Sequence, residues 1–196
     1  MSKSEPEKPN EYFTIEHALS YLEIADDIPH RIEGEAVVLE LLPSNVQRIL
    51  DLGAGDGRLL ALAKLVRPKA YGVAMDFSPT MLEKSRSRFA EDVKVEVMEH
   101  DLNNTLPDIG TFDVVLSCFA IHHLSDERKH AIYSEVFTLL EPGGIFCNLE
   151  HVASPKKERR LGDRLPALQG TRRQIGDDLA SGSGVLRQRL RRYTRN

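Results

Sequence analysis

Glycines recur at every second position after an aspartate, in the pattern Asp51-x-Gly53-Ala54-Gly55-x-Gly57. Glycine lets a backbone turn tightly and approach a ligand, because no Cβ stands in the way. An apolar run precedes the glycines and a helical pattern follows them, so the turn leads into a helix N-terminus, whose N–H groups and dipole favour an anion. Asp51 adds a negative charge at the end of the apolar run. The stretch therefore predicts a pocket for a ligand that carries charges of both signs.

Two further aspartates follow later strand patterns, in positions that suit a nucleoside. Asp76 comes about twenty residues after the glycine turn, where a carboxylate can accept both hydrogen bonds from a ribose diol. Asp101 can accept a hydrogen bond from an exocyclic adenine amine, and Leu102 can pack near the base. The alternative for both aspartates is structural: Asp76 would cap a helix or hold a turn, and Asp101 would be a solvated loop residue.

The side chains that could act as bases or nucleophiles lie just past a strand pattern at 112–117. His122 and His123 are the available general bases by residue type, although the favoured interpretation is that they only build contacts between the ligand site and the next helix. Adjacent histidines rarely point to one ion and no third ligand is evident, so we expect no metal site. Cys118 lacks the preceding proline that covalent cytosine chemistry uses. It and Cys147 are interpreted as reduced core residues.

Strand and helix patterns alternate along the chain. Strands are expected at 48–52, 70–75, 93–98, 112–117 and 145–149. Helices are expected at 14–25, 33–42, 58–66, 78–89 and 125–140, with a turn at 141–144. Short connections of this kind predict right-handed crossovers and a parallel sheet covered by helices on both faces, with the ligand beyond the carboxyl ends of the strands. The distinctive polar residues at those ends are Asp51, Asp76, Asp101 and Ser117.

The composition indicates one soluble domain followed by a basic tail. The chain has 196 residues, of which 41% are hydrophobic and 29% charged, enough for one core but not comfortably for two. Residues 1–153 hold 14 Lys and Arg against 26 Asp and Glu, and residues 154–196 hold 12 against 4. We therefore expect a domain at 11–153 and a basic, partly disordered tail at 154–196. The polar segment 1–10 is expected to be disordered and is no signal peptide, and no apolar run could cross a membrane, which predicts a cytoplasmic protein.

Together these motifs resemble those of class I S-adenosylmethionine (SAM)-dependent methyltransferases over about residues 45–150. The likeness rests on the glycine turn, on residues 73–78, 99–102 and 112–124, and on the Leu-Glu-Pro-Gly-Gly segment at 140–144. It implies a three-layer αβα sandwich with a Rossmann-like, mostly parallel sheet, SAM as co-substrate and methyl transfer as the reaction. Asp51 and the glycine turn would hold the methionine part, Asp76 the ribose and Asp101 the adenine. The residues that the resemblance assigns to the cofactor are Asp51, Gly53, Ala54, Gly55, Gly57, Asp76, Phe77, Asp101, Leu102 and Ser117.

The resemblance stops after Pro155. The family fold normally adds a further helix and a strand hairpin beside the fifth strand, and residues 156–196 show no alternating apolar run. We therefore expect a sheet that lacks the usual C-terminal hairpin and exposes an edge, and hypothesise that the chain is a truncated or alternatively terminated form of a longer methyltransferase. The basic tail could also bind RNA phosphates, although no aromatic ladder accompanies its charges.

The acceptor of the methyl group is the least specified feature. A small molecule is favoured, because residues 112–124 look like the corresponding segment of small-molecule methyltransferases; tRNA or protein acceptors stay open within the class. A non-catalytic SAM-binding or regulatory protein is the alternative from another class. An NAD-dependent oxidoreductase is disfavoured, because the third glycine comes one residue early for its fingerprint. Helices before the first strand often close over the cofactor in this family, and the candidate lid residues are Tyr12, Tyr21, His30 and Arg31. The oligomeric state stays open.

Overall fold

The computed structural model describes residues 14–150, apart from the side chain of Asp26. The predictions for the N-terminal segment 1–10, for Tyr12 and for the basic tail 154–196 lie outside these residues. The described residues belong to one compact unit that ends at His151.

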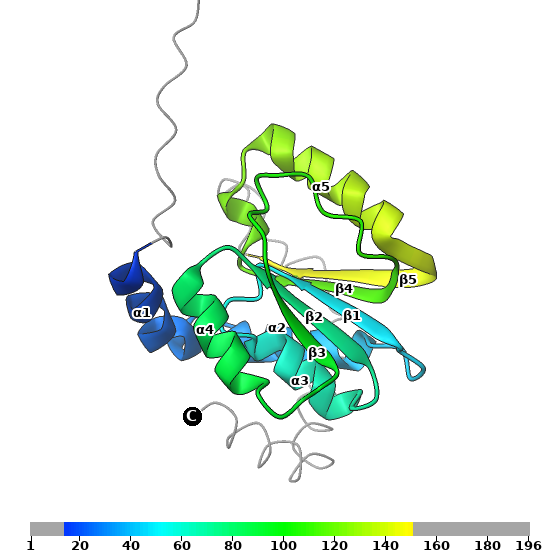
Figure 1. Ribbon diagram of the computed structural model, residues 1–196, viewed down its shortest axis with the longest axis horizontal. Helices are drawn as coiled ribbons and strands as arrows, with labels where there is room; N and C mark the ends of the chain where they lie inside the picture. The colour runs from blue at the N-terminus through cyan, green and yellow to red at the C-terminus, as the bar shows by residue number, and fades with distance from the viewer. Residues whose placement is uncertain (1–13, 151–196) are drawn as a thin grey trace, which may run out of the picture. The chain divides into compact units, whose positions relative to one another are not determined.

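Five parallel strands form the central sheet, in the spatial order β3-β2-β1-β4-β5 (Figure 1). The strands are β1 (Arg48–Leu52), β2 (Tyr71–Asp76), β3 (Val95–Glu99), β4 (Phe112–Cys118) and β5 (Leu140–Leu149). The order reverses between β1 and β4, which is where open sheets of this kind place their ligands. Each strand matches a predicted one to within a few residues, except that β5 is longer at its start.

The start of β5 corrects the predicted turn at 141–144. Leu140 already pairs with Phe112 of β4, and the next paired residues are Val114 and Ile145. Residues 141–144 therefore form an irregularity inside the strand instead of a turn before it. Gly143 has a φ of +84° there, a backbone conformation that glycine adopts without strain. Gly and Pro usually indicate a turn, but they also mark bulges in edge strands, which is the case here.

Helices cover both faces of the sheet, as predicted. The main helices are α1 (Ile15–Ile24), α2 (Arg31–Leu41), α3 (Arg58–Val66), α4 (Pro79–Arg88) and α5 (Asp126–Leu139), with short 3₁₀ turns η2 (Ala25–Asp27) and η3 (Ile121–His123). Figure 1 shows α5 on one side of the sheet and α2, α3 and α4 on the other. The predicted three-layer αβα architecture is confirmed.

Capping residues fix the ends of the helices as the sequence indicates, with one exception. Thr14 caps α1 by accepting a hydrogen bond from His17 N at 3.3 Å, and Ser125 caps α5 by accepting one from Arg128 N at 3.2 Å. Ser78 stands at the cap position of α4 but its hydroxyl does not cap, and its buried Oγ has no partner within residues 14–150. The carboxylate of Asp76 accepts the Ser78 N–H instead, at 2.9 Å.

The sheet separates two apolar layers. Leu50 and Leu52 of β1 are fully buried and belong to the cluster that α5 completes through Ile132 and Val136. The intervening Asp51 points to the opposite layer, where its carboxylate meets the start of α3. The alternation of side chains along β1 therefore places one carboxylate between two apolar residues, at the carboxyl end of a buried strand. Among residues 14–150, no helix is both long and apolar enough to cross a membrane.

Candidate functional site

A cavity opens at the carboxyl ends of β1, β2 and β4. The empty space inside it, together with its open mouth, is about 860 Å³. Eight of the ten residues predicted to bind the cofactor line it: Asp51, Gly53, Ala54, Gly55, Asp76, Phe77, Asp101 and Leu102. The topology thus brings together residues that lie fifty positions apart in the sequence.

The glycine turn forms one wall of the cavity, and two of its glycines adopt left-handed backbone conformations for different reasons. Gly53 has a φ of +66°, and a Cβ at this position would lie 2.2 Å from the Cβ of Ala120. The loop after β4 therefore packs directly onto the turn. Gly55 has a φ of +56°, and the nearest atom to a Cβ there would be Met81 Sδ at 3.9 Å. Since Gly55 and Met81 both line the cavity, the space beside Gly55 is left to a ligand.

Asp51 is the most unusual group of the site. Its side chain is buried, Oδ2 accepts a hydrogen bond from Leu60 N at 3.1 Å, and Oδ1 has no partner within the described residues. Burial raises the pKa of the Asp51 carboxyl to about 7, and the hydrogen bond from Leu60 only partly offsets this effect. A cation that entered the cavity beside Oδ1 would favour the ionised form.

Asp76 joins the end of β2 to the glycine turn. Its Oδ2 accepts from Gly55 N at 2.8 Å, and Oδ1 accepts from Ser78 N at 2.9 Å. Burial raises the pKa of this carboxyl, while the hydrogen bonds from backbone N–H groups oppose the rise. Each carboxylate oxygen has a second lone pair, so the fixed carboxylate can still accept from a ligand in the cavity.

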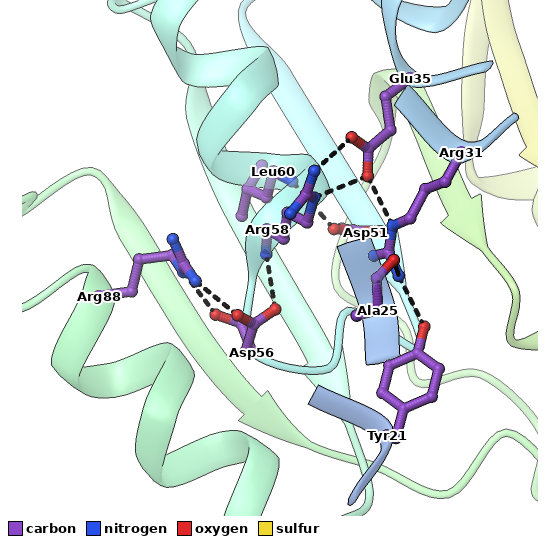
Figure 2. Close-up of polar contacts among 9 residues, drawn as sticks. All are labelled: Tyr21, Ala25, Arg31, Glu35, Asp51, Asp56, Arg58, Leu60 and Arg88. Atoms are coloured by element: carbon purple, nitrogen blue, oxygen red, sulfur yellow. Dashed lines mark hydrogen bonds and ion pairs between the residues drawn. The ribbon is translucent and has the colours of Figure 1, made fainter. Parts of the chain in front are cut away.

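A buried ion triad connects the N-terminal helices to the glycine turn (Figure 2). Glu35 of α2 accepts from Arg31 Nε at 2.9 Å, and from Arg58 Nε and Nη2 at 2.8 and 3.0 Å. Arg31 also donates to the Tyr21 hydroxyl at 3.0 Å, and its guanidinium lies 5.7 Å from the ring centre of Phe119. Two guanidiniums share one carboxylate, so the triad itself carries a net positive charge.

Two of the candidate lid residues thus reach the site. Tyr21 and Arg31 line the cavity, whereas the side chain of His30 is exposed and outside it. Sequence reasoning missed Glu35 and Arg58. The spacing of Arg31 and Glu35 at i and i+4 is the signal that could have indicated a pair, although such pairs usually lie on the solvent face.

Asp101 lies in a loop that fixes its own geometry. Oδ1 accepts from Asn103 N at 2.9 Å and from Asn103 Nδ2 at 3.0 Å, while the backbone carbonyl accepts from Asn104 N at 2.9 Å. Leu102 follows, is 6% exposed and packs into the core beneath the cavity. The loop thus presents a carboxylate beside an apolar side chain.

The histidine pair divides into two environments. His123 lines the cavity, and its ring centre lies 4.0 Å from that of His122. His122 is outside the lining and pairs with Glu150 at the end of β5, with Nδ1 and Oε2 separated by 2.6 Å and the His122 N–H donating to Oε1 at 3.2 Å. Glu150 was not foreseen, since a single acidic residue at a strand end carries no pattern.

Three residues with expected roles are placed elsewhere or differently. Gly57 is outside the cavity lining, and its missing Cβ leaves room for the Phe89 ring, which a Cβ would approach to 2.5 Å. Ser117 is fully buried and donates to Leu52 O at 3.0 Å, joining β4 to β1. Cys147 is a core residue as predicted, but Cys118 lines the cavity. Burial raises the pKa of the Cys118 thiol to about 12, so it is neutral near pH 7. Residues 14–150 contain no group of three or more His, Cys, Asp or Glu side chains that could hold a metal ion.

Comparisons with known proteins agree with this geometry. Residues 49–144 match the family model described as a methyltransferase domain. The chain is 37% identical over 127 residues to a demethylmenaquinone methyltransferase of Clavibacter sepedonicus, covering 65% of this chain and 50% of that protein. It is 34% identical over 137 residues to the demethylmenaquinone methyltransferase of Thermus thermophilus, covering 69% and 60%. The fold resembles human N-acetylserotonin methyltransferase in complex with SAM, with a TM-score of 0.59 and 18% identity over 79% of this chain and 44% of that one.

The chain spans between half and three-fifths of the length of these two sequence relatives. The matched region contains the glycine turn, the strand-end aspartates and the histidine pair, and the fold around them is the one that the resemblance implies. Residues 49–144 of this chain are therefore a methyltransferase domain, with the fold and motifs of the class I SAM-dependent type.

Proposed function

We propose that this chain binds SAM in the cavity described above and transfers its methyl group to a small-molecule acceptor. One arrangement carries the proposal: the carboxylates at the ends of three strands, Asp51, Asp76 and Asp101, line a single cavity with the glycine turn. SAM presents an ammonium group, a ribose diol and an exocyclic amine, each of which donates hydrogen bonds. Three carboxylates along one cavity suit three such donors in a row.

The methionine end of SAM fits the region between Asp51 and Arg31. Asp51 Oδ1 is a buried acceptor without a partner in the described chain, which suits an ammonium group. Arg31 is held by Glu35 and Tyr21 with its guanidinium at the cavity, which suits a carboxylate. The N–H groups at the start of α3 add to the attraction for the carboxylate.

The nucleoside end fits the opposite side. Asp76 would accept from the ribose hydroxyls while it holds Gly55, so the same carboxylate fixes the turn and the sugar. Asp101 Oδ1 is occupied by Asn103, which leaves Oδ2 to accept from the adenine amine. Phe77 and Leu102 supply apolar lining for the base.

When bound, SAM supplies a methyl group on a positively charged sulfur, a good leaving group that needs mainly in-line positioning. The residues of the chain must then orient the acceptor and take its proton. We propose that His122 accepts this proton: its ring is outside the cavity lining but lies 4.0 Å from that of His123, which lines the cavity. In the tautomer whose Nδ1–H donates to Glu150 Oε2, the other ring nitrogen, Nε2, is left as the basic nitrogen. This is the arrangement of a general base oriented by a carboxylate.

A hydroxylated, largely apolar small molecule is the acceptor class that suits this site. A hydroxyl needs a base, and the cavity walls near the histidine pair include the side chains of Phe119, Leu124 and Tyr21. The names of two sequence relatives refer to demethylmenaquinone, and we therefore choose quinols, the reduced and hydroxylated form of quinones, as the first compounds to test.

Calorimetric titration of the full chain with SAM tests the cofactor site. We expect saturable binding, and we expect Asp76→Ala to weaken it by about 1–3 kcal/mol, because hydrogen bonds to a charged acceptor are lost. Asp126→Ala is the matched control, since its side chain is 91% exposed and far from the strand ends in sequence. The proposal fails if the folded wild-type chain does not bind SAM, or if both variants bind it equally well.

The assignment of the base predicts a rate effect without a binding effect. His122→Gln should lower kcat for methyl transfer by about 10²-fold or more, since a positioned base contributes on this scale, and should leave the Kd for SAM unchanged. Transfer of labelled methyl from SAM to a panel of quinols and phenols provides the measurement. Glu150→Gln should produce a smaller loss, and His130→Gln, an exposed histidine on α5, should produce none. Equal rates for His122→Gln and His130→Gln would exclude His122 as the base.

A further inference from the structure

An arginine on α5 holds the loop that carries Asp101 and Leu102, from behind the cavity wall. Arg128 donates from Nε to Leu102 O at 2.6 Å and from Nη2 to Asn104 O at 2.7 Å. Arg128 therefore holds the loop through two backbone carbonyls, one on each side of Asn103. Arg128 does not line the cavity.

Glu135, on the same helix, binds both Arg128 and the loop. Its two oxygens accept from Arg128 Nη1 and Nη2 at 2.5 and 2.8 Å, and Oε2 also accepts from Leu106 N at 2.9 Å. The side chains of Arg128 and Glu135 are 11% and 21% exposed. The hydrogen bonds from Arg128 are the main reason that the pKa of Glu135 lies below its ordinary value. We refer to Arg128 and Glu135 together as the α5 clip.

The clip connects a buried helix to a loop that has no regular secondary structure. Arg128 and Glu135 lie two helical turns apart, and Ile132 between them is fully buried against the sheet. Residues 100–111 between β3 and β4 contain no helix or strand. Figure 1 shows this connection passing beside α5. The hydrogen bonds of Arg128 and Glu135 thus tie an irregular segment to a buried helix at Leu102, Asn104 and Leu106.

The loop in turn orients the Asp101 carboxylate. Asp101 Oδ1 is held by the backbone and side chain of Asn103, and Asn104 N donates to the Asp101 carbonyl. The position of Oδ2 is therefore set by the loop backbone, and the position of that backbone is set by the clip. A fixed acceptor discriminates between ligands more strongly than a mobile one, because less ordering is required on binding.

We propose that Arg128 is a positioning residue for adenine recognition: through the α5 clip it holds Asp101 where its carboxylate can select the exocyclic amine of the base. This inference rests on the proposed SAM site. According to this inference, α5 affects how selectively the site binds adenine, although the helix itself does not contact the nucleoside.

The test uses two ligands and three variants of the full chain. The ligands are S-adenosylhomocysteine and its purine-riboside analogue, in which hydrogen replaces the amino group. The variants are Arg128→Gln, Arg128→Lys, which retains the charge but not the forked donors, and the control Lys129→Gln, which removes one positive charge from the neighbouring, partly exposed position. Calorimetric titration gives each Kd, and thermal unfolding confirms that each variant is folded.

Wild type and Lys129→Gln should prefer the adenine ligand over the analogue by about 10-fold or more, as one hydrogen bond to a carboxylate allows. Both Arg128 variants should lose about 10-fold in affinity for the adenine ligand, lose less for the analogue, and so show a preference below about 3-fold. The inference is overturned if the Arg128 variants keep the wild-type preference, because Asp101 would then be positioned without the clip. It is also overturned if they lose affinity for both ligands equally, because the clip would then act on the whole cavity. A folded wild-type chain that binds neither ligand would instead overturn the proposed function itself.

Discussion

Replacing Glu35 by alanine is expected to lower the free energy of unfolding by about 3–5 kcal/mol, the usual cost of removing one partner from a buried ion pair. Glu35 forms ion pairs with both Arg31 and Arg58, and its own side chain is 4% exposed. The side chains of Arg31 and Arg58 are only 6% and 12% exposed, so water cannot replace the lost carboxylate without opening the packing between α2 and α3. Affinity for SAM should fall as well, because Arg31 would lose the group that orients it.

Urea unfolding of three variants measures this effect. Glu40→Ala is the matched control, since Glu40 is an exposed glutamate on the same helix, and it should change stability by less than about 0.5 kcal/mol. Glu35→Gln should lie between the two, because glutamine keeps the volume and one acceptor oxygen but removes the charge. A loss below about 1 kcal/mol for Glu35→Ala would mean that the two guanidiniums find water or other acceptors, and that the triad does not hold α2 in place.

The triad also illustrates which features the sequence can predict. The strands, the glycine turn and the strand-end aspartates follow from local patterns, because apolar period and glycine spacing reflect contacts within one segment. Parallel topology then collects Asp51, Asp76 and Asp101 at one edge without further information. Glu35 and Arg58 meet only when α2 packs beside the start of α3, and nothing in either segment distinguishes them from surface charges.

Ser117 is a residue that the sequence pattern groups with the site and the structure places outside the cavity lining. Its place at the carboxyl end of β4 predicts a site residue, but its hydroxyl donates to Leu52 O and joins two strands. Position at a strand end is therefore informative for residues that leave the sheet, such as Asp101. It is weaker for those whose side chains still alternate within the sheet, because alternate side chains point to opposite faces.

Gly53→Ala is expected to damage both folding and ligand binding, whereas Gly55→Ala should affect mainly binding. Both positions have left-handed backbone conformations, which cost an alanine roughly 1–2 kcal/mol. At position 53 the new methyl group would also lie 2.2 Å from the Cβ of Ala120, and relieving that overlap adds about 1–3 kcal/mol. At position 55 the nearest atom is 3.9 Å away, so the methyl group is accommodated by the protein but occupies space beside Asp76 that the proposal gives to SAM.

The pair Gly53 and Ala120 allows the two causes to be separated. Adding Ala120→Gly to Gly53→Ala removes the overlapping methyl group, so the double variant should recover the overlap component and retain only the backbone cost. Denaturant unfolding of wild type, both single variants and the double variant gives the coupling free energy, which we expect to be about 1–3 kcal/mol and favourable. Additive losses would contradict the close packing of the β4 loop on the glycine turn. Recovery of SAM affinity together with stability would further indicate that this packing, more than the left-handed backbone itself, keeps the turn in the form that binds the cofactor.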